Sequence, residues 1–319
     1  MKVATKIRNT GIPLTLIKIS ATALLVYYAI SSVTFDNLIK VIYGIDPRYF
    51  FPIFALWFFN QILTTLRWAV LLPPLNFSIP FKFLFRSTMI GHFANYYVPG
   101  EWGVDASWFW TLHTRSGEKL KPIVSLAMDK LIALSATLFV SLVSWLLGQD
   151  FIASEINQAL FPIYIFVFIT PFIFIIFAKH KAALPDKMQV FFSIFHDIWR
   201  SYGMRYSLLT RSLSIAILAR VITVIFIWLL AQSIGMRAPS ILFFILVPLI
   251  LIISSIPIAF QNIGVKEGLY VYFFTHAGVP AEEALGLALL VVVWSLGTGL
   301  VCSVAYLTPD GIAKPRGAQ

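Results

Sequence analysis

The chain has 319 residues, of which 59% are hydrophobic and 12% are charged, and its mean hydropathy is +0.85. These values lie far outside the range of soluble domains, so the sequence predicts an all-α polytopic membrane protein. The formal net charge of +10 does not indicate nucleic-acid binding, because the basic residues gather in short loops between apolar segments. A single cysteine, Cys302, excludes an internal disulfide and a cysteine-based metal cluster.

Six apolar segments are long enough to cross a bilayer, which takes about 20 residues of helix. We predict spanning helices over residues 12–31, 49–72, 122–147, 160–178, 212–233 and 284–306. Two further apolar segments, 80–110 and 240–278, contain helix-breaking residues, and we interpret them as interrupted or re-entrant helices. The residues that break them are Pro99, Gly100, Gly103, Pro257, Gly264 and Gly268.

The distribution of basic residues predicts the orientation, since cytoplasmic loops carry the excess of lysine and arginine. Both termini and the loops 112–121 and 179–211 are basic and are expected to be cytoplasmic, whereas 148–158 has only acidic charges. These assignments agree only if the first interrupted segment enters and leaves from the cytoplasm and the second from the outside. If both segments spanned fully, the basic loop 112–121 would lie outside.

This topology predicts one integral membrane domain over 1–319, with halves 1–158 and 159–319 of opposite orientation. Many transporters use such inverted halves, each of which offers a broken helix to a site near the membrane midplane. No repeat is visible between the two halves at the level of residues.

Polar residues cluster at each interruption. In the first segment Asn95, Glu101 and Asp105 surround the break, and a helix that starts there would point free amide groups at an anion. In the second segment Asn262, Lys266 and Glu267 surround the break in the same way. The alternative for both clusters is a hydrated turn at the membrane surface.

Five charged residues lie inside predicted spans: Lys18, which is expected to reach the interface with its long side chain, and Arg67, Asp129, Lys130 and Arg220. Such residues cost several kcal/mol unless they are paired or hydrated, which makes them functional candidates. Structural alternatives exist for three of the last four. Asp129 could pair with a nearby arginine, Lys130 could reach the interface, and Arg67 with Trp68 could anchor its helix end.

Five motifs occur in an order that resembles a known family. They are Arg67-Trp68, Asn95-Tyr-Tyr-Val-Pro-Gly-Glu-Trp-Gly-Val-Asp105, Asp129-Lys130, Ile256-Pro-Ile and Gly264-Val-Lys-Glu-Gly268. Over nearly the whole chain this order is similar to the lysylphosphatidylglycerol synthase transmembrane region, or flippase-like, family. The resemblance implies a two-part membrane domain that moves lysylphosphatidylglycerol between leaflets in bifunctional members and has been linked to glycolipid carriers in others.

The chain departs from the bifunctional members of that family. It ends at residue 319 without room for the soluble aminoacyl-transferase domain, so synthesis of the lysyl-lipid is not expected. Lysine replaces the more usual arginine at Lys130 and Lys266, and Trp108 stands where an arginine often follows Asp105. An indole cannot make the bidentate phosphate contact of a guanidinium, which argues against phosphate binding at Trp108.

The sequence therefore predicts a flippase-type transporter of the cell membrane that moves a phosphorylated lipid or a lipid-linked glycan carrier, with no catalytic residue, metal or cofactor. The expected binding or translocation residues are Arg67, Asn95, Glu101, Asp105, Asp129, Lys130, Arg220, Asn262, Lys266 and Glu267. Basic members would offset phosphate charge, and acidic members would supply counter-ions or proton coupling. Two alternatives stay open, a membrane subunit that partners a glycosyltransferase or other lipid-modifying enzyme, and an intramembrane lipid-modifying enzyme. A homo-oligomer is compatible with each.

Overall fold

The computed structural model describes residues 43–95, 102–151, 205–255 and 264–307, with further single positions at 39, 157, 162, 197, 198 and 200–203. Among these residues four long helices are apolar enough to cross a membrane: α3 (Phe50–Leu71), α6 (Leu120–Gly148), α9 (Tyr206–Ser233) and α12 (Ala281–Leu307). They confirm the predicted spans 49–72, 122–147, 212–233 and 284–306. The predicted spans 12–31 and 160–178 lie outside the described residues.

The two interrupted segments each form a pair of short helices. The first pair is α4 (Phe81–Ala94) and α5 (Gly103–Ser116), and the second is α10 (Ser240–Ser255) and α11 (Val265–His276). At 1.5 Å per residue these helices are about 18–24 Å long, shorter than a hydrocarbon core of about 30 Å. Short 3₁₀ turns, η1 (Pro47–Tyr49), η2 (Pro73–Leu75) and η4 (Gln149–Phe151), flank the longer helices.

Two details of the predicted interruptions are wrong. Gly268 lies inside α11 and does not break a helix, because a buried glycine in a helix costs only about 1 kcal/mol relative to alanine. Gly264 lies directly before α11, and its φ of +83° is the left-handed conformation that glycine adopts readily. The first segment also continues to Ser116, so Arg115 belongs to α5 and not to a loop. Pro99, Gly100 and Pro257 lie outside the described residues.

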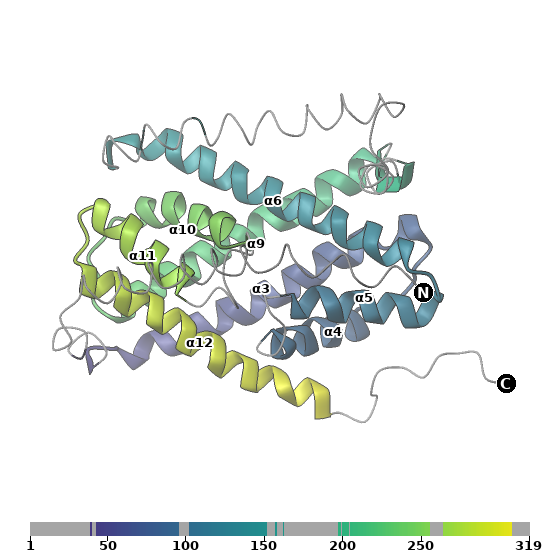
Figure 1. Cartoon of the computed structure of the whole chain (residues 1–319), viewed down its shortest axis with the longest axis horizontal. Coiled ribbons are helices and arrows are strands. Elements are labelled where there is room, and N and C mark those ends of the chain that lie inside the picture. The colour runs from purple at the N-terminus through teal and green to yellow at the C-terminus, as the bar shows by residue number, and fades with distance from the viewer. Residues whose placement is uncertain are drawn as a thin grey trace, which may run out of the picture.

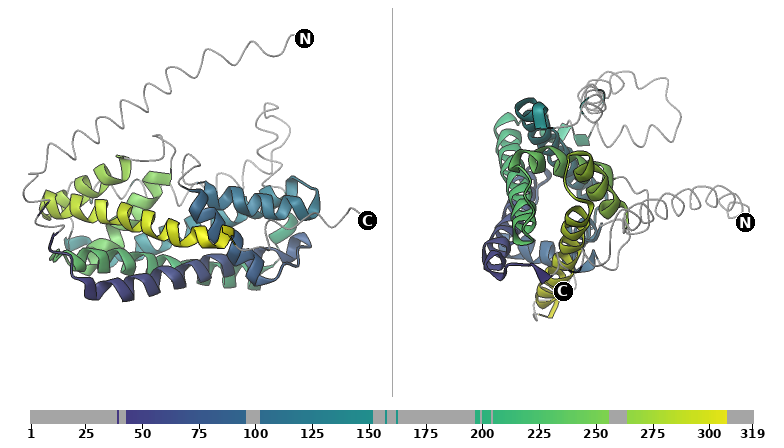
Figure 2. Two further views of the ribbon diagram at one scale, coloured as in Figure 1. Left: turned by 90° about the horizontal axis from the view of Figure 1, so that it is seen from below. Right: turned by 90° about the vertical axis from the view of Figure 1, so that its left-hand side faces the viewer.

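The two helix pairs lie at opposite ends of the long helices. Figure 1 shows α4 and α5 at the right and α10 and α11 at the left, and the view from below in Figure 2 agrees. Each pair has its own apolar core: one joins α10 and α11 to α9 and α12, and the other joins α4 and α5 to α3 and α6. This arrangement is the one expected of two broken segments that enter from opposite faces, although the side of entry stays a prediction.

Glycine lets α4 and α5 approach closely where the first hairpin turns. A Cβ atom on Gly103 would overlap the backbone of Asn95 and Gly91, and one on Gly91 would overlap Val104. The Asn95 side chain completes this contact, because its Oδ1 accepts a hydrogen bond of 2.6 Å from the Gly103 amide. The side chain of Asn95 therefore holds the two short helices together.

We expect Gly103→Ala to destabilise the protein by about 1–3 kcal/mol, because an added methyl group at a closed backbone contact forces a helix to shift. The matched control is Gly297→Ala in α12, where a Cβ atom meets nothing within 4 Å and alanine favours the helix. Thermal unfolding of both variants in detergent micelles measures the difference. An unchanged Tm for Gly103→Ala would contradict the close approach of α4 and α5.

Candidate functional site

A buried ion pair links two of the long helices. Arg67 of α3 donates from Nε to Asp129 Oδ1 at 2.7 Å and from Nη2 to Asp129 Oδ2 at 2.8 Å. Arg67 is only 9% exposed and Asp129 only 2%. Two parallel charge-assisted hydrogen bonds are the strongest geometry for such a pair. The pair neutralises both residues, so neither of them alone explains a charged substrate site.

Lys130, the residue after Asp129 in α6, makes a second ion pair, which connects α6 to α5. Lys130 Nζ lies 2.8 Å from Asp105 Oδ2 of α5. Asp105 also lies within electrostatic range of Arg67 and Asp129. Asp129 therefore connects α6 to α3, and the next residue, Lys130, connects α6 to α5.

This second pair is open at its lysine end only, since the Lys130 side chain is 63% exposed and the Asp105 side chain 21%. We expect Lys130→Gln to destabilise the protein by about 1–3 kcal/mol, because it leaves the mostly buried Asp105 carboxylate without its partner. Unfolding of this variant beside Lys121→Gln, whose pair with Glu118 is exposed at both ends, provides the comparison. Equal losses for the two variants would show that the Lys130–Asp105 pair is no stronger than an exposed one.

Arg220 is the charged residue that the ion pairs leave uncompensated. It lies about 21 Å along α9 from Tyr206, near the middle of that helix and deeper than the sequence suggested. Among the described residues it makes no ion pair, and its Nε atom is buried without a hydrogen-bond partner. The positive charge of Arg67 acts on it as well, which adds repulsion. Arg220 is thus an unneutralised cation inside a membrane span.

A second unsatisfied polar atom lies near Arg220 on the facing helix. Asn60 of α3 donates from Nδ2 to Thr223 Oγ1 at 3.4 Å, and Thr223 is one turn beyond Arg220 on α9. The Asn60 Oδ1 atom is buried and accepts no hydrogen bond. Unsatisfied buried groups are rare in proteins and call for an explanation such as an absent ligand. The α3–α9 interface therefore offers one free donor and one free acceptor at membrane depth.

We call Arg67, Asp105, Asp129, Lys130 and Arg220 the central charge cluster. All five were predicted from the sequence as site residues, and α3, α5, α6 and α9 bring them together. The three basic and two acidic side chains leave one positive charge. Ionisable residues that gather inside an apolar helix bundle are candidates for a substrate or ion site.

The contact between two tryptophans next to the cluster was not predicted, although the sequence had singled out both residues. Trp68 and Trp108 stack in parallel, with ring centroids 4.2 Å apart, and both are buried. Trp68 Nε1 donates to Ser125 Oγ, and Trp108 Nε1 donates to Thr88 Oγ1, each at 3.1 Å. Trp108 therefore makes a packing contact between α3 and α5.

The structure gives Glu267 of the second interruption a local role. Its carboxylate accepts a hydrogen bond of 2.7 Å from the Gly264 amide and caps the start of α11. Glu267 is therefore a capping residue, and its predicted contact with substrate stays a prediction, as does that of Lys266. Glu101 and Asn262 lie outside the described residues.

Comparison with known proteins agrees with the order of motifs in the chain. No curated protein and no solved structure matches the sequence. A family model described as the lysylphosphatidylglycerol synthase TM region matches residues 15–302, which includes every described helix except the last few residues of α12. The protein therefore belongs to the lysylphosphatidylglycerol synthase transmembrane region family.

Proposed function

We propose that the protein is a transporter of the flippase type, which moves a lipid with an anionic, phosphorylated head group between the leaflets of the cell membrane. The family is associated with membrane domains for lipid modification or transport, and the charge of the site favours transport of an anionic lipid. The observation that carries the proposal is Arg220, a cation in the middle of a span with no counter-ion among the described residues.

The central charge cluster supports a phosphorylated head group in particular. A planar guanidinium forms strong hydrogen bonds with phosphate oxygens, and the unsatisfied Nε atom of Arg220 is one donor for them. The Asn60 Oδ1 atom could accept a hydrogen bond from a hydroxyl group of the same head group. The acyl or prenyl chains would stay in the bilayer while the head group crosses at Arg220.

The site also needs to release its substrate, and the Lys130–Asp105 pair suits that step because its lysine end is exposed. This pair joins the first short-helix pair to α6, and water can replace Asp105 as the partner of Lys130 when the pair opens. By contrast, the buried Arg67–Asp129 pair would keep α3 and α6 fixed beside the site. In many transporters one part of the helix bundle moves against another part around a fixed substrate site, and a fixed pair of long helices with a movable helical hairpin would fit that motion.

A lipid-translocation assay in proteoliposomes tests the proposal. The full chain is reconstituted with fluorescent phosphatidylglycerol, phosphatidylethanolamine or a polyprenyl phosphate, and the rate at which each probe changes leaflet is measured. We expect the anionic lipids to move faster than the zwitterionic one. Arg220→Met should slow them at least tenfold, since losing a charge-assisted hydrogen bond of about 1.5–3 kcal/mol has an effect of that size.

The matched control is Arg211→Met, which removes an exposed arginine from the same helix. This variant should transport at the rate of the unmodified protein. Equal rates for Arg220→Met and the unmodified protein would overturn the role of Arg220. Failure of the unmodified protein to move any of the three lipids would overturn the proposed transport itself and favour a subunit of a lipid-modifying enzyme.

A further inference from the structure

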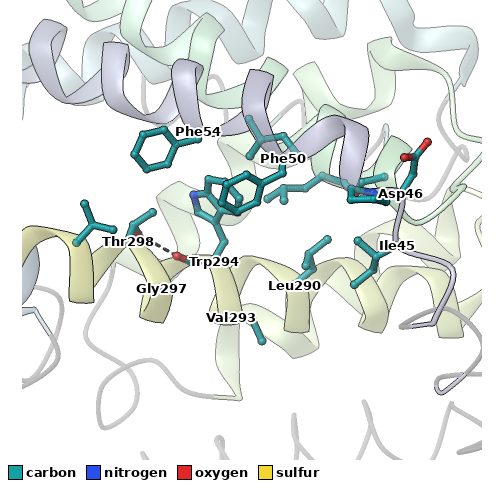
Figure 3. Close-up of a pocket in the computed structure, with 14 residues that line it drawn as sticks. Ile45, Asp46, Phe50, Phe54, Leu290, Val293, Trp294, Gly297 and Thr298 are labelled. Carbon is teal, nitrogen blue, oxygen red and sulfur yellow. Dashed lines mark hydrogen bonds between the residues drawn. The ribbon is translucent and has the colours of Figure 1, made fainter.

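A cavity lies between the start of α3, the end of α9 and the middle of α12. It has a volume of about 460 Å³, within the range of small-molecule sites. Its walls include Ile45, Phe50, Phe54, Leu290, Val293 and Gly297, and we call it the α3–α12 groove (Figure 3). No residue of the central charge cluster lines it.

The hydroxyl groups in the wall of the groove are already used inside the protein. Thr298 Oγ1 donates to the Trp294 carbonyl at 2.9 Å, the bond drawn in Figure 3, and Ser233 Oγ donates to the Leu230 carbonyl at 2.7 Å. The indole Nε1 of Trp294 is buried and has no hydrogen-bond partner, so it is an unused donor among the residues that line the groove. A polar ligand would therefore lose its hydration and gain few hydrogen bonds, whereas a hydrocarbon chain loses nothing.

The surroundings of the groove identify the source of that chain. Val293, Leu296 and Leu300 on α12 are 62%, 51% and 70% exposed, although α12 is a membrane-spanning helix. In a bilayer these side chains contact lipid, so the groove opens from a surface that acyl chains already cover. Its rim carries Asp46 and the η1 turn, which come directly before the start of α3. A lipid chain can therefore enter from the bilayer while its head group stays near the rim.

Gly297 keeps the groove open. A Cβ atom at this position would meet no atom within 4 Å, although the residue lies in the middle of a long helix where glycine is unfavourable. Trp294 of the same helix lies against Phe50 of α3, with ring centroids 5.5 Å apart and planes at 58°. The rings leave a fixed apolar slot that a flexible chain can fill.

We propose that the α3–α12 groove binds one acyl chain of a bilayer phospholipid. This site is independent of the transport site at Arg220, because the two share no residue. Its function is to hold a lipid against α3, α9 and α12 whether or not the central charge cluster carries a head group. Bulk added at position 297 fills the slot and displaces the chain.

Photocrosslinking measures this occupancy. The full chain is reconstituted in vesicles of phosphatidylglycerol and phosphatidylethanolamine that contain a phospholipid with a photoreactive acyl chain, and crosslinked peptides are mapped by mass spectrometry. We expect labels on the segments around Phe50–Phe54 and Leu290–Thr298. Gly297→Trp should reduce the labelling of Phe50–Phe54 at least fivefold.

Leu296→Trp is the matched control, because it adds the same ring one residue away at an exposed position that does not line the groove. It should leave the Phe50–Phe54 labelling unchanged. Gly297→Leu adds a smaller side chain to the groove, and it replaces Gly297→Trp in the test if the tryptophan variant does not fold. Undiminished labelling in folded Gly297→Leu or Gly297→Trp would overturn the proposal. Protein–protein crosslinks at the groove in place of lipid labels would also overturn the proposal. They would show that a second copy of the chain, or another segment of the same chain, occupies the groove.

Discussion

Arg220→Met is expected to make the protein more stable while it slows the transport of anionic lipids at least tenfold. Arginine at the centre of a membrane helix costs about 2.5–3.5 kcal/mol on insertion scales, and no ion pair among the described residues offsets that cost. Methionine has a similar length, carries no charge and fits irregular apolar sites. We therefore expect a gain of about 2 kcal/mol and a Tm a few degrees higher in detergent micelles.

The direction of this change separates a binding residue from a structural one. A structural arginine would lower the Tm when it is removed, because its partners would lose their hydrogen bonds. Arg211→Met serves as the control for the loss of one positive charge, and it should leave the Tm nearly unchanged because Arg211 is exposed. A lower Tm for Arg220→Met would mean that its guanidinium is satisfied within the protein and would remove the basis of the proposed site.

Ligand addition gives the complementary result. A lipid that binds only the folded protein stabilises it by about 2.7 kcal/mol at a concentration of one hundred times its Kd. Short-chain phosphatidylglycerol should therefore raise the Tm of the unmodified protein and leave that of Arg220→Met unchanged. Short-chain phosphatidylcholine, which carries no net charge, is the control lipid and should have a smaller effect on both.

The sequence predicted the membrane fold and the two interruptions because both leave strong local signals. A run of some 20 apolar residues is nearly unambiguous, and prolines and glycines inside such a run mark a break. It also pointed to Arg67, Asp129 and Arg220, because charges are rare inside membrane helices. These signals lie within single segments and need no knowledge of which helices meet.

A pairing of Asp129 with an arginine was among the expectations and is confirmed, but which arginine pairs with it could not be predicted, because that depends on the packing of distant segments. Arg67 and Asp129 are 62 positions apart, and nothing in either segment shows that they pair while Arg220 is left alone. Helix ends were also misjudged: α9 begins at Tyr206, six residues before the predicted span, which moves Arg220 to the middle. Gly268 was read as a break because glycine in a helix and glycine in a turn look the same in a sequence.

We expect the intact Arg67–Asp129 pair to contribute little net stability, whereas removal of one partner alone should destabilise the protein strongly. Asp129→Asn leaves the Arg67 guanidinium buried without a counter-ion, and Arg67→Met leaves the carboxylate in the same position. We expect each single substitution to destabilise the protein by about 3–5 kcal/mol, because an uncompensated charge remains in the apolar interior.

The double variant Arg67→Met/Asp129→Leu removes both charges together and should recover most of that loss, since apolar replacement of a buried ion pair is often neutral or stabilising. Equilibrium unfolding of the four proteins gives the coupling energy directly. Additive losses, with the double variant the least stable of the four, would show that the two side chains act separately. Recovery in the double variant would instead establish that the pair is self-contained, so that the remaining positive charge of the central charge cluster belongs to Arg220.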